Sequence, residues 1–255
     1  MASKRNPTDL SPSQPALIEM QDDVRSHFGW DVSDDSSSAH ELLQRVEASS
    51  IENWARHNRA AALSRIYRRL VIRDPKIAIL GAAIESNEIV RILDSPTLIV
   101  AADGASGVLS EIPKSLSELA WSRMACIVSD ADGGYGTIKA VSRSVPIILH
   151  AHGDNREDWL SLIQEAESQT NPPDLVLTHQ TPSKINGMHN PGGFTDGDRA
   201  ACFLTALGVR PSSIMMLGTR TDTVGRWSGS TDEPRKSEKL RWMKRSLQIQ
   251  GLWTD

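Results

Sequence analysis

Cys126-Ile-Val-Ser-Asp-Ala-Asp-Gly-Gly134 joins a short apolar run to two carboxylates and two glycines. If the strand continues extended through Ser129, the two-residue period of a strand places Asp130 and Asp132 on the same side of the backbone. Open α/β sheets bind their ligands at the carboxyl ends of strands, and a carboxylate pair suits a hard cation such as Mg²⁺. A polar β-turn is the alternative, because Asp-Gly is a common turn dipeptide.

Other apolar runs after Pro75 alternate with helical patterns. The predicted strands are Lys76–Leu80, Thr97–Ala102, Met124–Val128, Val145–Leu149, Asp174–Thr178 and Ser213–Leu217. The predicted helices between them are Glu85–Leu93, Leu116–Arg123, Arg156–Ser168 and Asp196–Leu207. Runs of Ile, Val and Leu separated by helices are typical of a parallel sheet. We therefore expect an α/β fold: a three-layer, mostly parallel sheet with helices on both faces.

The beginning of the chain has a different pattern. Residues 1–11 indicate a loose tail, and apolar side chains recur at helical spacing from Ser13 to Phe28. Ser38-Ala-His-Glu41 then resembles a capping box before another helix. We expect a flexible tail and helical N-terminal region over residues 1–72, followed by an α/β domain over residues 73–255. Trp30 and Trp54 are interpreted as core residues rather than as platforms for a ligand.

Composition limits the partners and the location. The chain has 255 residues and a formal net charge of −4. Broad binding to nucleic acid or to an anionic membrane requires a basic excess, so neither is expected. The start lacks the apolar core of a signal peptide, and no stretch reaches the ~18 apolar residues of a membrane span. The two cysteines, Cys126 and Cys202, are expected to be buried thiols, which fits a reducing, cytoplasmic location.

Carboxylates also follow two other predicted strands. Asp103 comes directly after the second strand, and Asp154 comes shortly after the fourth. Because the carboxyl ends of parallel strands share one edge, these acids and the Asp130/Asp132 pair would ring one crevice. Clustered carboxylates repel one another unless cations neutralise them, so we expect Mg²⁺ and, with it, phosphate. Asp103 and Asp154 could each instead cap a helix or form a turn.

Two histidines stand between the fourth predicted strand and Asp154. His150 and His152 have the alternating spacing of a zinc pair, but no third His or Cys ligand is nearby. We therefore expect an imidazole that bonds the neighbouring acids or the substrate.

A glycine-rich segment, Gly187-Met-His-Asn-Pro-Gly-Gly-Phe-Thr-Asp-Gly-Asp-Arg199, leads into the next predicted helix. Thr195 or Asp196 would cap this helix, whose free amide groups favour an anion or a polar ring edge. A plain loop with a capped helix is the alternative to a binding surface.

Motifs for other enzyme classes are absent. The chain has no G-x-x-x-x-G-K-[ST] and no G-x-S-x-G, which argues against a P-loop and an α/β-hydrolase. Gly81, after the first strand, is a weak candidate for a phosphate cradle, and close packing explains it equally well. Residues 219–237 have no periodicity, and a loop of that length is either functional or disordered. A last helix is predicted over Glu238–Gln250.

Taken together, these segments resemble the archaeal-type 6-hydroxymethyl-7,8-dihydropterin pyrophosphokinases, a family related in fold to thiamin pyrophosphokinase. The matching segments are Ala101-Ala-Asp-Gly-Ala105, Val128-Ser-Asp-Ala-Asp-Gly133, His150-Ala-His-Gly-Asp-Asn155 and Gly193-Phe-Thr-Asp-Gly-Asp-Arg-Ala200. Phe28-Gly-Trp30 also looks like that family's N-terminal region. The last two matching segments are the more specific, since thiamin pyrophosphokinases share the Asp-Gly and Asp-x-Asp elements. Gly81-Ala-Ala-Ile-Glu85 and Gly218-Thr-Arg-Thr-Asp222 depart from the family's pattern, so the ATP contacts are less defined.

The resemblance implies Mg²⁺-dependent transfer of diphosphate from ATP to the hydroxymethyl oxygen of the pterin, with release of AMP. It implies metal ligation by Asp103, Asp130, Asp132 and Asp154. The implied catalytic residues are Asp130, Asp132, Asp154 and His152, where the histidine could accept the hydroxyl proton. Substrate contacts are implied for Asn155, Gly193, Phe194, Thr195, Asp196, Asp198 and Arg199, with Asp196 or Asp198 on the amino-pyrimidine edge. ATP contacts are implied for Gly81, Asp103, Gly104, Arg226, Lys236 and Lys239, for whose basic members a solvated charged face is the alternative.

Two other functions stay open at this point. One is a diphosphokinase for thiamin or another hydroxymethyl heterocycle, and the other is a non-catalytic nucleotide- or glycan-precursor-binding protein of the same fold. The expected partners are the small molecules ATP and a hydroxymethyl pterin, without nucleic acid or membrane. Homo-oligomerisation and the choice between folate and tetrahydromethanopterin synthesis are left open.

Overall fold

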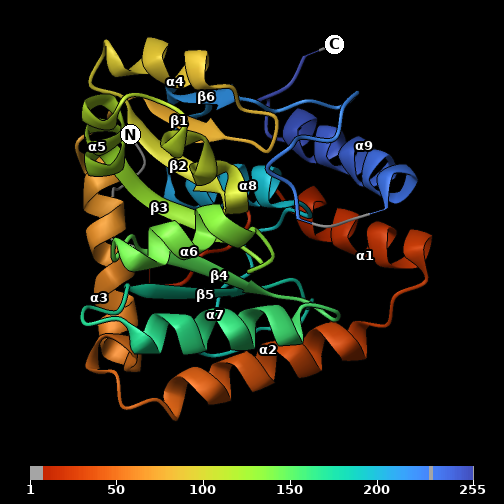
Figure 1. The fold of residues 1–255 in the computed structure, drawn as a ribbon. Helices are drawn as coiled ribbons and strands as arrows, with labels where there is room; N and C mark the ends of the chain where they lie inside the picture. Colours follow the sequence, from red (N-terminus) through yellow and green to blue (C-terminus); the bar gives the residue numbers. More distant parts are fainter. Residues whose placement is uncertain (1–7, 230–231, 255) are drawn as a thin grey trace.

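A parallel sheet forms the centre of the computed structural model, which describes residues 8–229 and 232–254 (Figure 1). Its six strands, all parallel, have the order β5-β4-β3-β2-β1-β6. The strands are β1 (Ile77–Leu80), β2 (Leu98–Ala102), β3 (Met124–Ser129), β4 (Ile147–Ala151), β5 (Leu175–His179) and β6 (Ile214–Leu217). Every predicted strand is present within two residues at each end, and the α/β class is confirmed.

Helices cover both faces of this sheet. They are α1 (Ala16–Phe28), α2 (Val32–Glu47), α3 (Arg56–Tyr67), α4 (Ser86–Leu93), α5 (Lys114–Arg123), α6 (Gly134–Ser142), α7 (Arg156–Ser168), α8 (Asp196–Leu207) and α9 (Glu233–Ile249). Alternate strand residues enter two cores: Ile77 and Ile79 pack with α3, α8 and α9, whereas Ala78 and Leu80 pack with α2 and α4–α7. This alternation follows from the two-residue period of a strand and confirms three layers.

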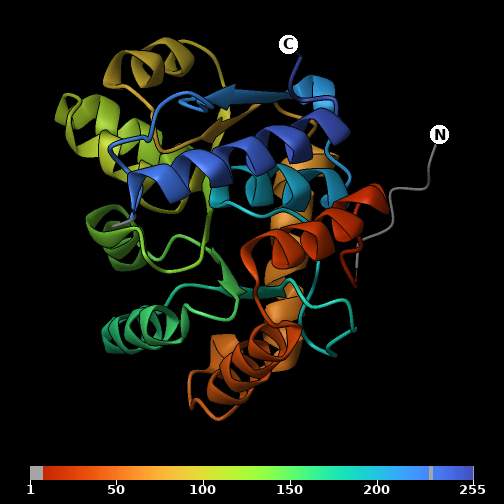
Figure 2. The ribbon, with the colours of Figure 1, turned by 90° about the vertical axis from the view of Figure 1, so that its right-hand side faces the viewer.

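The order of the strands reverses once. The chain steps from β1 to β5 in one direction and then returns, through α8 on the opposite face, to place β6 beside β1. Such a reversal opens a crevice at the carboxyl ends of the strands, where α/β sheets bind ligands. Helix α1 lies beside α9 in both views of the ribbon (Figures 1 and 2).

Several details differ from the predictions. Helix α2 begins at Val32 with Asp31 as its N-cap, so Ser38 is not a capping residue but lies inside the helix, where its hydroxyl accepts a hydrogen bond from Trp159 Nε1. Helix α9 begins five residues earlier than predicted, at Glu233, because Asp232 caps it. Helix α6 and the 3₁₀ segment Asp103–Ser110 were not predicted.

The N-terminal tail differs from its prediction in part, whereas the two cysteines and Trp54 agree with theirs. Residues 1–7 of the predicted tail lie outside the described residues, and Leu10 is buried rather than loose. Cys126, Cys202 and Trp54 are buried as predicted. Among the described residues, no helix has the length and apolar character needed to cross a membrane.

Candidate active site

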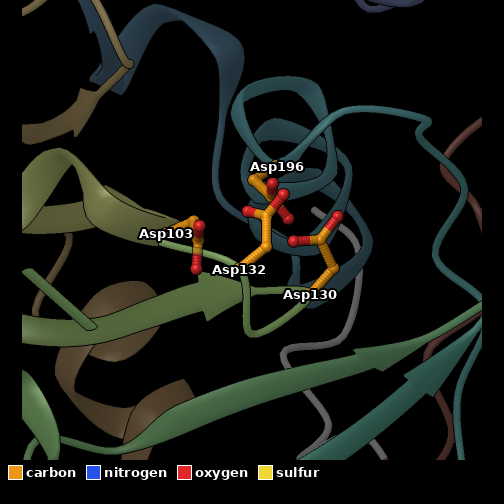
Figure 3. A group of neighbouring side chains, drawn as sticks. All are labelled: Asp103, Asp130, Asp132 and Asp196. Atoms are coloured by element: carbon orange, nitrogen blue, oxygen red, sulfur yellow. The ribbon is translucent and has the colours of Figure 1, made fainter. Parts of the chain in front are cut away.

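Four carboxylates meet at the carboxyl edge of the sheet (Figure 3). Asp103 comes directly after β2, Asp130 and Asp132 lie in the loop after β3, and Asp196 is the first residue of α8. One ligand oxygen from each lies within 4.8 Å of the others. The convergence of Asp103, Asp130 and Asp132 agrees with the sequence prediction, but the fourth member of the group is Asp196 rather than Asp154.

A tight turn brings Asp130 and Asp132 to the same side. Strand β3 ends at Ser129, and Ala131 has φ = 81°, in the left-handed region that residues with a side chain rarely adopt. The Ser129 hydroxyl accepts a 2.9 Å hydrogen bond from the Ala131 backbone N–H and holds this turn closed. Strand β3 does extend through Ser129 as expected, but the convergence of the two side chains follows from the turn at Ala131 rather than from the two-residue period of a strand.

Asp103 is held in place by hydroxyl groups and by a glycine. Its carboxylate accepts hydrogen bonds from the Ser129 hydroxyl and, at 3.0 Å, from the Thr137 hydroxyl. A Cβ on Gly133 would lie 2.3 Å from Asp103 Oδ2, so only glycine leaves room for this carboxylate. Burial, followed by the charges of Asp196 and Asp130, raises the pKa of Asp103 well above its ordinary value.

Asp130 has one engaged and one free oxygen. Its Oδ2 lies 3.2 Å from both His152 Nε2 and Arg199 Nη1. Burial acts to raise the pKa of Asp130, but His152 and Arg199 together lower it below the ordinary value. Its Oδ1 is buried and has no hydrogen-bond partner among the residues that the structure describes. A buried lone pair without a donor is costly, and a cation would satisfy it.

The remaining two acids are pushed toward protonation. Burial and the charge of Asp130 raise the pKa of Asp132, and the same two causes raise the pKa of Asp196 to about 7. Repulsion of this kind is relieved when a divalent cation enters a carboxylate cluster. The all-oxygen donor set and the free Asp130 Oδ1 fit a hard cation such as Mg²⁺.

Two cavities flank the carboxylates. The first lies over the ends of β1 and β6 and is lined by Gly81, Gly218, Thr219 and Trp227, among others. The second is lined by Trp30, Phe194, His152 and Lys239, among others. Asp132, Thr195, Asp196 and Lys236 line both cavities. A molecule in either cavity would therefore touch the same pair of carboxylates.

The second cavity has an aromatic and basic wall. The rings of Phe28 and Trp30 stack with centroids 4.8 Å apart, and Phe194 lies 6.0 Å from Trp30. The Lys239 ammonium lies 5.7 Å from the Trp30 centroid and 5.9 Å from that of Phe194. Burial, followed by the charge of Lys236, lowers the pKa of Lys239. Trp30 was expected in the core, yet it is only half-buried and lines this cavity.

The predicted residues of the β4 loop have other neighbours. Asp154 is 68% exposed and pairs with His152 Nδ1 at 2.6 Å, outside the four-carboxylate group. Burial would lower the pKa of His152, but hydrogen bonds to Asp130 and Asp154 raise it to about 9. Asn155 is buried, and its amide donates to the backbone carbonyls of Asp130 and His150 at 2.8 Å. Asn155 therefore holds the two loops together rather than facing a cavity.

His150, the other histidine of the pair for which a bond to neighbouring acids or substrate was expected, is buried behind the site. Its Nδ1 lies 3.1 Å from the Thr178 hydroxyl and its Nε2 lies 3.4 Å from Gln180 Oε1. Burial and the charge of Arg199 hold the pKa of His150 well below its ordinary value.

The glycine-rich segment is partly turned inward. Phe194, Thr195, Asp196 and Arg199 line the second cavity. Asp198 is fully buried and accepts from the backbone N–H groups of Phe194 and Thr195, so it caps α8 and does not face the cavity. The Gly193 carbonyl accepts from the Gln21 side chain.

The residues expected to contact ATP do not all lie in the same cavity. Gly81 and Asp103 line the first cavity, Lys236 lines both, and Lys239 lines the second. Gly104 packs against Gly133 and Trp227. Arg226 forms an ion pair with Glu111, lies 4.8 Å from the Trp227 ring centroid, and is not among the residues that line the two cavities.

Sequence reasoning missed two polar groups of the site. Gln180 follows β5 and contacts Arg199, but an uncharged amide after a strand gives no signal in the sequence. The Thr219 hydroxyl is buried in the wall of the first cavity and has no partner within residues 8–229 and 232–254. Its segment, Gly218-Thr-Arg-Thr-Asp222, departs from the family's pattern, and that departure is the signal that marks it.

Two curated archaeal proteins are similar to the chain. Both are named 6-hydroxymethyl-7,8-dihydropterin pyrophosphokinase. The protein of Pyrococcus furiosus is 34% identical over 130 residues, which cover 51% of this chain and 48% of the relative. The protein of Methanothermobacter thermautotrophicus is 34% identical over 123 residues, covering 47% of this chain and 45% of the relative. The chain thus spans about half the length of the curated relatives it matches, and no protein-family model matches it. The resemblance expected from the motifs is confirmed.

Proposed function

We propose that the chain catalyses the Mg²⁺-dependent transfer of diphosphate from ATP to 6-hydroxymethyl-7,8-dihydropterin. The observation that carries this proposal is the group of four carboxylates between two cavities, in a chain of which about half is 34% identical to two relatives with that name. Diphosphoryl transfer needs a donor and an acceptor on opposite sides of a metal-bound phosphate. The arrangement of the cavities meets this requirement.

Asp103, Asp130, Asp132 and Asp196 would hold the metal. When bound there, Mg²⁺ would neutralise the negative charge of the phosphates and orient them. Asp154 lies outside this group, and its part is to hold His152. His152 has a pKa of about 9 and is a cation at neutral pH, so we assign it to charge neutralisation rather than to proton abstraction.

We place ATP in the first cavity. Its floor includes Gly81 and Gly218, where a Cβ on Gly81 would lie 2.7 Å from the Gly218 carbonyl oxygen and leave less room for a phosphate. The free Thr219 hydroxyl would donate to a ligand oxygen. Lys236, which lines both cavities, would meet the phosphates next to Asp132 and Asp196.

We place the pterin in the second cavity. Trp30 and Phe194 offer ring faces for stacking, and base–aromatic stacking contributes about 1–3 kcal/mol. Arg199, whose Nε is buried and has no partner, and Lys239 would meet the polar edge of the ring or the transferred phosphate. Trp30 comes from the N-terminal 72 residues, so the predicted helical region would complete the site of the 73–255 domain.

The chemistry follows from this placement. The hydroxymethyl oxygen attacks the β-phosphorus, the bond between that phosphorus and the α–β bridging oxygen breaks, and AMP leaves with the electron pair. The hydroxyl proton leaves to water. The protein aligns the two reactants and places Lys236, Arg199 and His152 around the charge that moves to the departing phosphate. A cytoplasmic location agrees with ATP as co-substrate.

An AMP-release assay tests the proposal. The purified chain should release AMP only when Mg²⁺ and hydroxymethyldihydropterin are both present, and hydroxymethylpyrimidine and thiamin should give less. ADP as the product, or thiamin as the better acceptor, would contradict it. A wild-type protein that binds ATP and never turns over with any of these alcohols would identify a binding protein instead.

A further inference from the structure

Gln180 is buried between two charged side chains from distant parts of the chain. It follows β5 directly, and only 4% of it is exposed. Its side-chain Nε2 lies 3.0 Å from each oxygen of Asp35, and its Oε1 lies 3.2 Å from Arg199 Nη2. A neutral amide thus joins a carboxylate of α2 to a guanidinium of α8.

The charges at its two ends leave the amide one orientation. A carboxylate only accepts hydrogen bonds and a guanidinium only donates them, so the NH₂ group must face Asp35 and the oxygen must face Arg199. Asp35 itself is fixed from other directions. Its Oδ1 accepts from the Gly153 backbone N–H at 2.8 Å, and its Oδ2 lies 3.2 Å from Arg25 Nη1. Arg25 also donates to the Gln180 backbone carbonyl at 2.9 Å.

Arg199 links the Gln180 amide to two carboxylates of the site. Its Nη1 lies 3.2 Å from Asp130 and 3.3 Å from Asp196, and its Nη2 is the group that Gln180 accepts from. If the Gln180 amide were reversed, its NH₂ group would face the guanidinium, donor against donor. Arg199 Nη2 would then lose its acceptor, and the repulsion would displace the guanidinium from its positions against Asp130 and Asp196.

We propose that Asp35 and Gln180 are positioning residues for the reaction proposed above, on which this inference rests. Asp35 fixes the orientation of the Gln180 amide, and Gln180 holds Arg199 against the metal-binding carboxylates. Helices α1 and α2, which supply Arg25 and Asp35, are therefore part of the active site. The same Asp35 also anchors the His152–Asp154 loop through Gly153.

A charge exchange between the two positions tests this relay. In Asp35→Asn one of the two acceptors of the Gln180 NH₂ group becomes a donor, so the Gln180 amide is no longer held in one orientation, and in Gln180→Glu two buried carboxylates oppose each other. Each change should lower kcat for AMP release roughly tenfold to a hundredfold, as removal of outer-shell partners does at metal sites, and affect KM for ATP little. The double variant Asp35→Asn/Gln180→Glu restores one amide and one carboxylate with the original net charge. It should therefore recover most of kcat.

The matched control is Asp34→Asn, the same chemical change on the exposed neighbouring residue, which should keep the wild-type kcat. Wild-type kcat in Asp35→Asn, or a double variant no better than the worse single variant, would overturn the relay. If Gln180→Glu does not fold, Gln180→Met removes donor and acceptor without adding charge. An undiminished kcat in Gln180→Met would also overturn the relay.

Thermal unfolding separates this inference from the proposed function. The destabilisation of the double variant should be smaller than the sum of the two single effects, because the two residues share one interaction. This comparison does not depend on turnover. An additive cycle would refute the relay even if the wild type were active, whereas a coupled cycle in an inactive wild type would refute only the proposed reaction.

Discussion

Arg199 Nη1 lies 3.2 Å from Asp130 Oδ2, while Oδ1 of the same carboxylate is buried without a partner. One oxygen is thus neutralised by the protein, and the other is left for a cation. Leaving a buried acceptor unsatisfied costs about 1–3 kcal/mol, which a bound metal ion would offset. The pair therefore gives the proposed metal site an oxygen that no other group in the described part of the chain contacts by a hydrogen bond.

Asp130→Asn should abolish tight metal binding. The change removes the charge that Arg199 and His152 surround, and it leaves three carboxylates in the group. Because a metal ion contributes several kcal/mol of transition-state stabilisation, kcat should fall by more than about a hundredfold. Electron paramagnetic resonance of free Mn²⁺ measures the affinity, and AMP release measures kcat.

Asp154→Asn is the matched control for that variant. The same substitution on an acid outside the group should leave Mn²⁺ affinity close to that of the wild type. Its effect on kcat should be smaller, because it only weakens the hold on His152. Equal losses of Mn²⁺ affinity in both variants would indicate that Asp154 is a metal ligand, as the sequence predicted.

Stabilisation by Mg²⁺ should increase with pH. The pKa of Asp196 is about 7 in the folded chain against an ordinary value of 3.8, because of burial and the charge of Asp130. The folded state then holds this proton more tightly, so the contribution to stability is fully present below about pH 4 and is lost as pH rises through about 7. Mg²⁺ binds the ionised form. The rise in Tm on adding Mg²⁺ should be small at pH 5.5 and large at pH 8, and a rise independent of pH would contradict this assignment.

The sequence predicts where the site lies, at the carboxyl edge of the sheet, better than it predicts which residues form the site. Strand ends at Asp103 and Asp130 can be located because the apolar run of each strand ends at or just before a carboxylate. A polar turn was the alternative that the sequence offered here, but the left-handed conformation of Ala131 could not be predicted, since alanine carries no signal for it. The two carboxylates converge in either geometry.

The positions of the Asp196 and Asp154 side chains could not be predicted from local sequence patterns. Asp196 reaches the carboxylates because the chain returns from β5 to β6 across the opposite face of the sheet, and strand order is a property of the whole fold. The direction of the Asp154 side chain depends on its bond to His152. Trp30 similarly lines a cavity because α1 packs on α9, which its own neighbours in the sequence do not reveal.

Trp30→Leu should weaken pterin binding and leave ATP binding unchanged. The lost stacking of about 1–3 kcal/mol corresponds to a rise of roughly fivefold to a hundredfold in KM for the pterin. Trp242→Leu is the control, since that ring packs on His27 and Arg245 and does not line the second cavity. Steady-state kinetics with each substrate varied in turn distinguish the two. A rise in KM for ATP alone would indicate that ATP, and not the pterin, binds in the second cavity.

Two adjacent glycines give the last prediction. A Cβ at Gly133 would lie 2.2 Å from the Gly104 backbone nitrogen and 2.3 Å from Asp103 Oδ2, whereas a Cβ at Gly134 meets nothing within 4 Å. Gly133→Ala should therefore cost about 1–3 kcal/mol of folding free energy through overpacking and displace Asp103 from the metal site. Gly134 has φ = 54°, so Gly134→Ala should cost about 1–2 kcal/mol through backbone strain alone. Both variants should lower Tm, but only Gly133→Ala should lose Mn²⁺ affinity. Retained affinity there would mean that Asp103 does not contribute to the metal site.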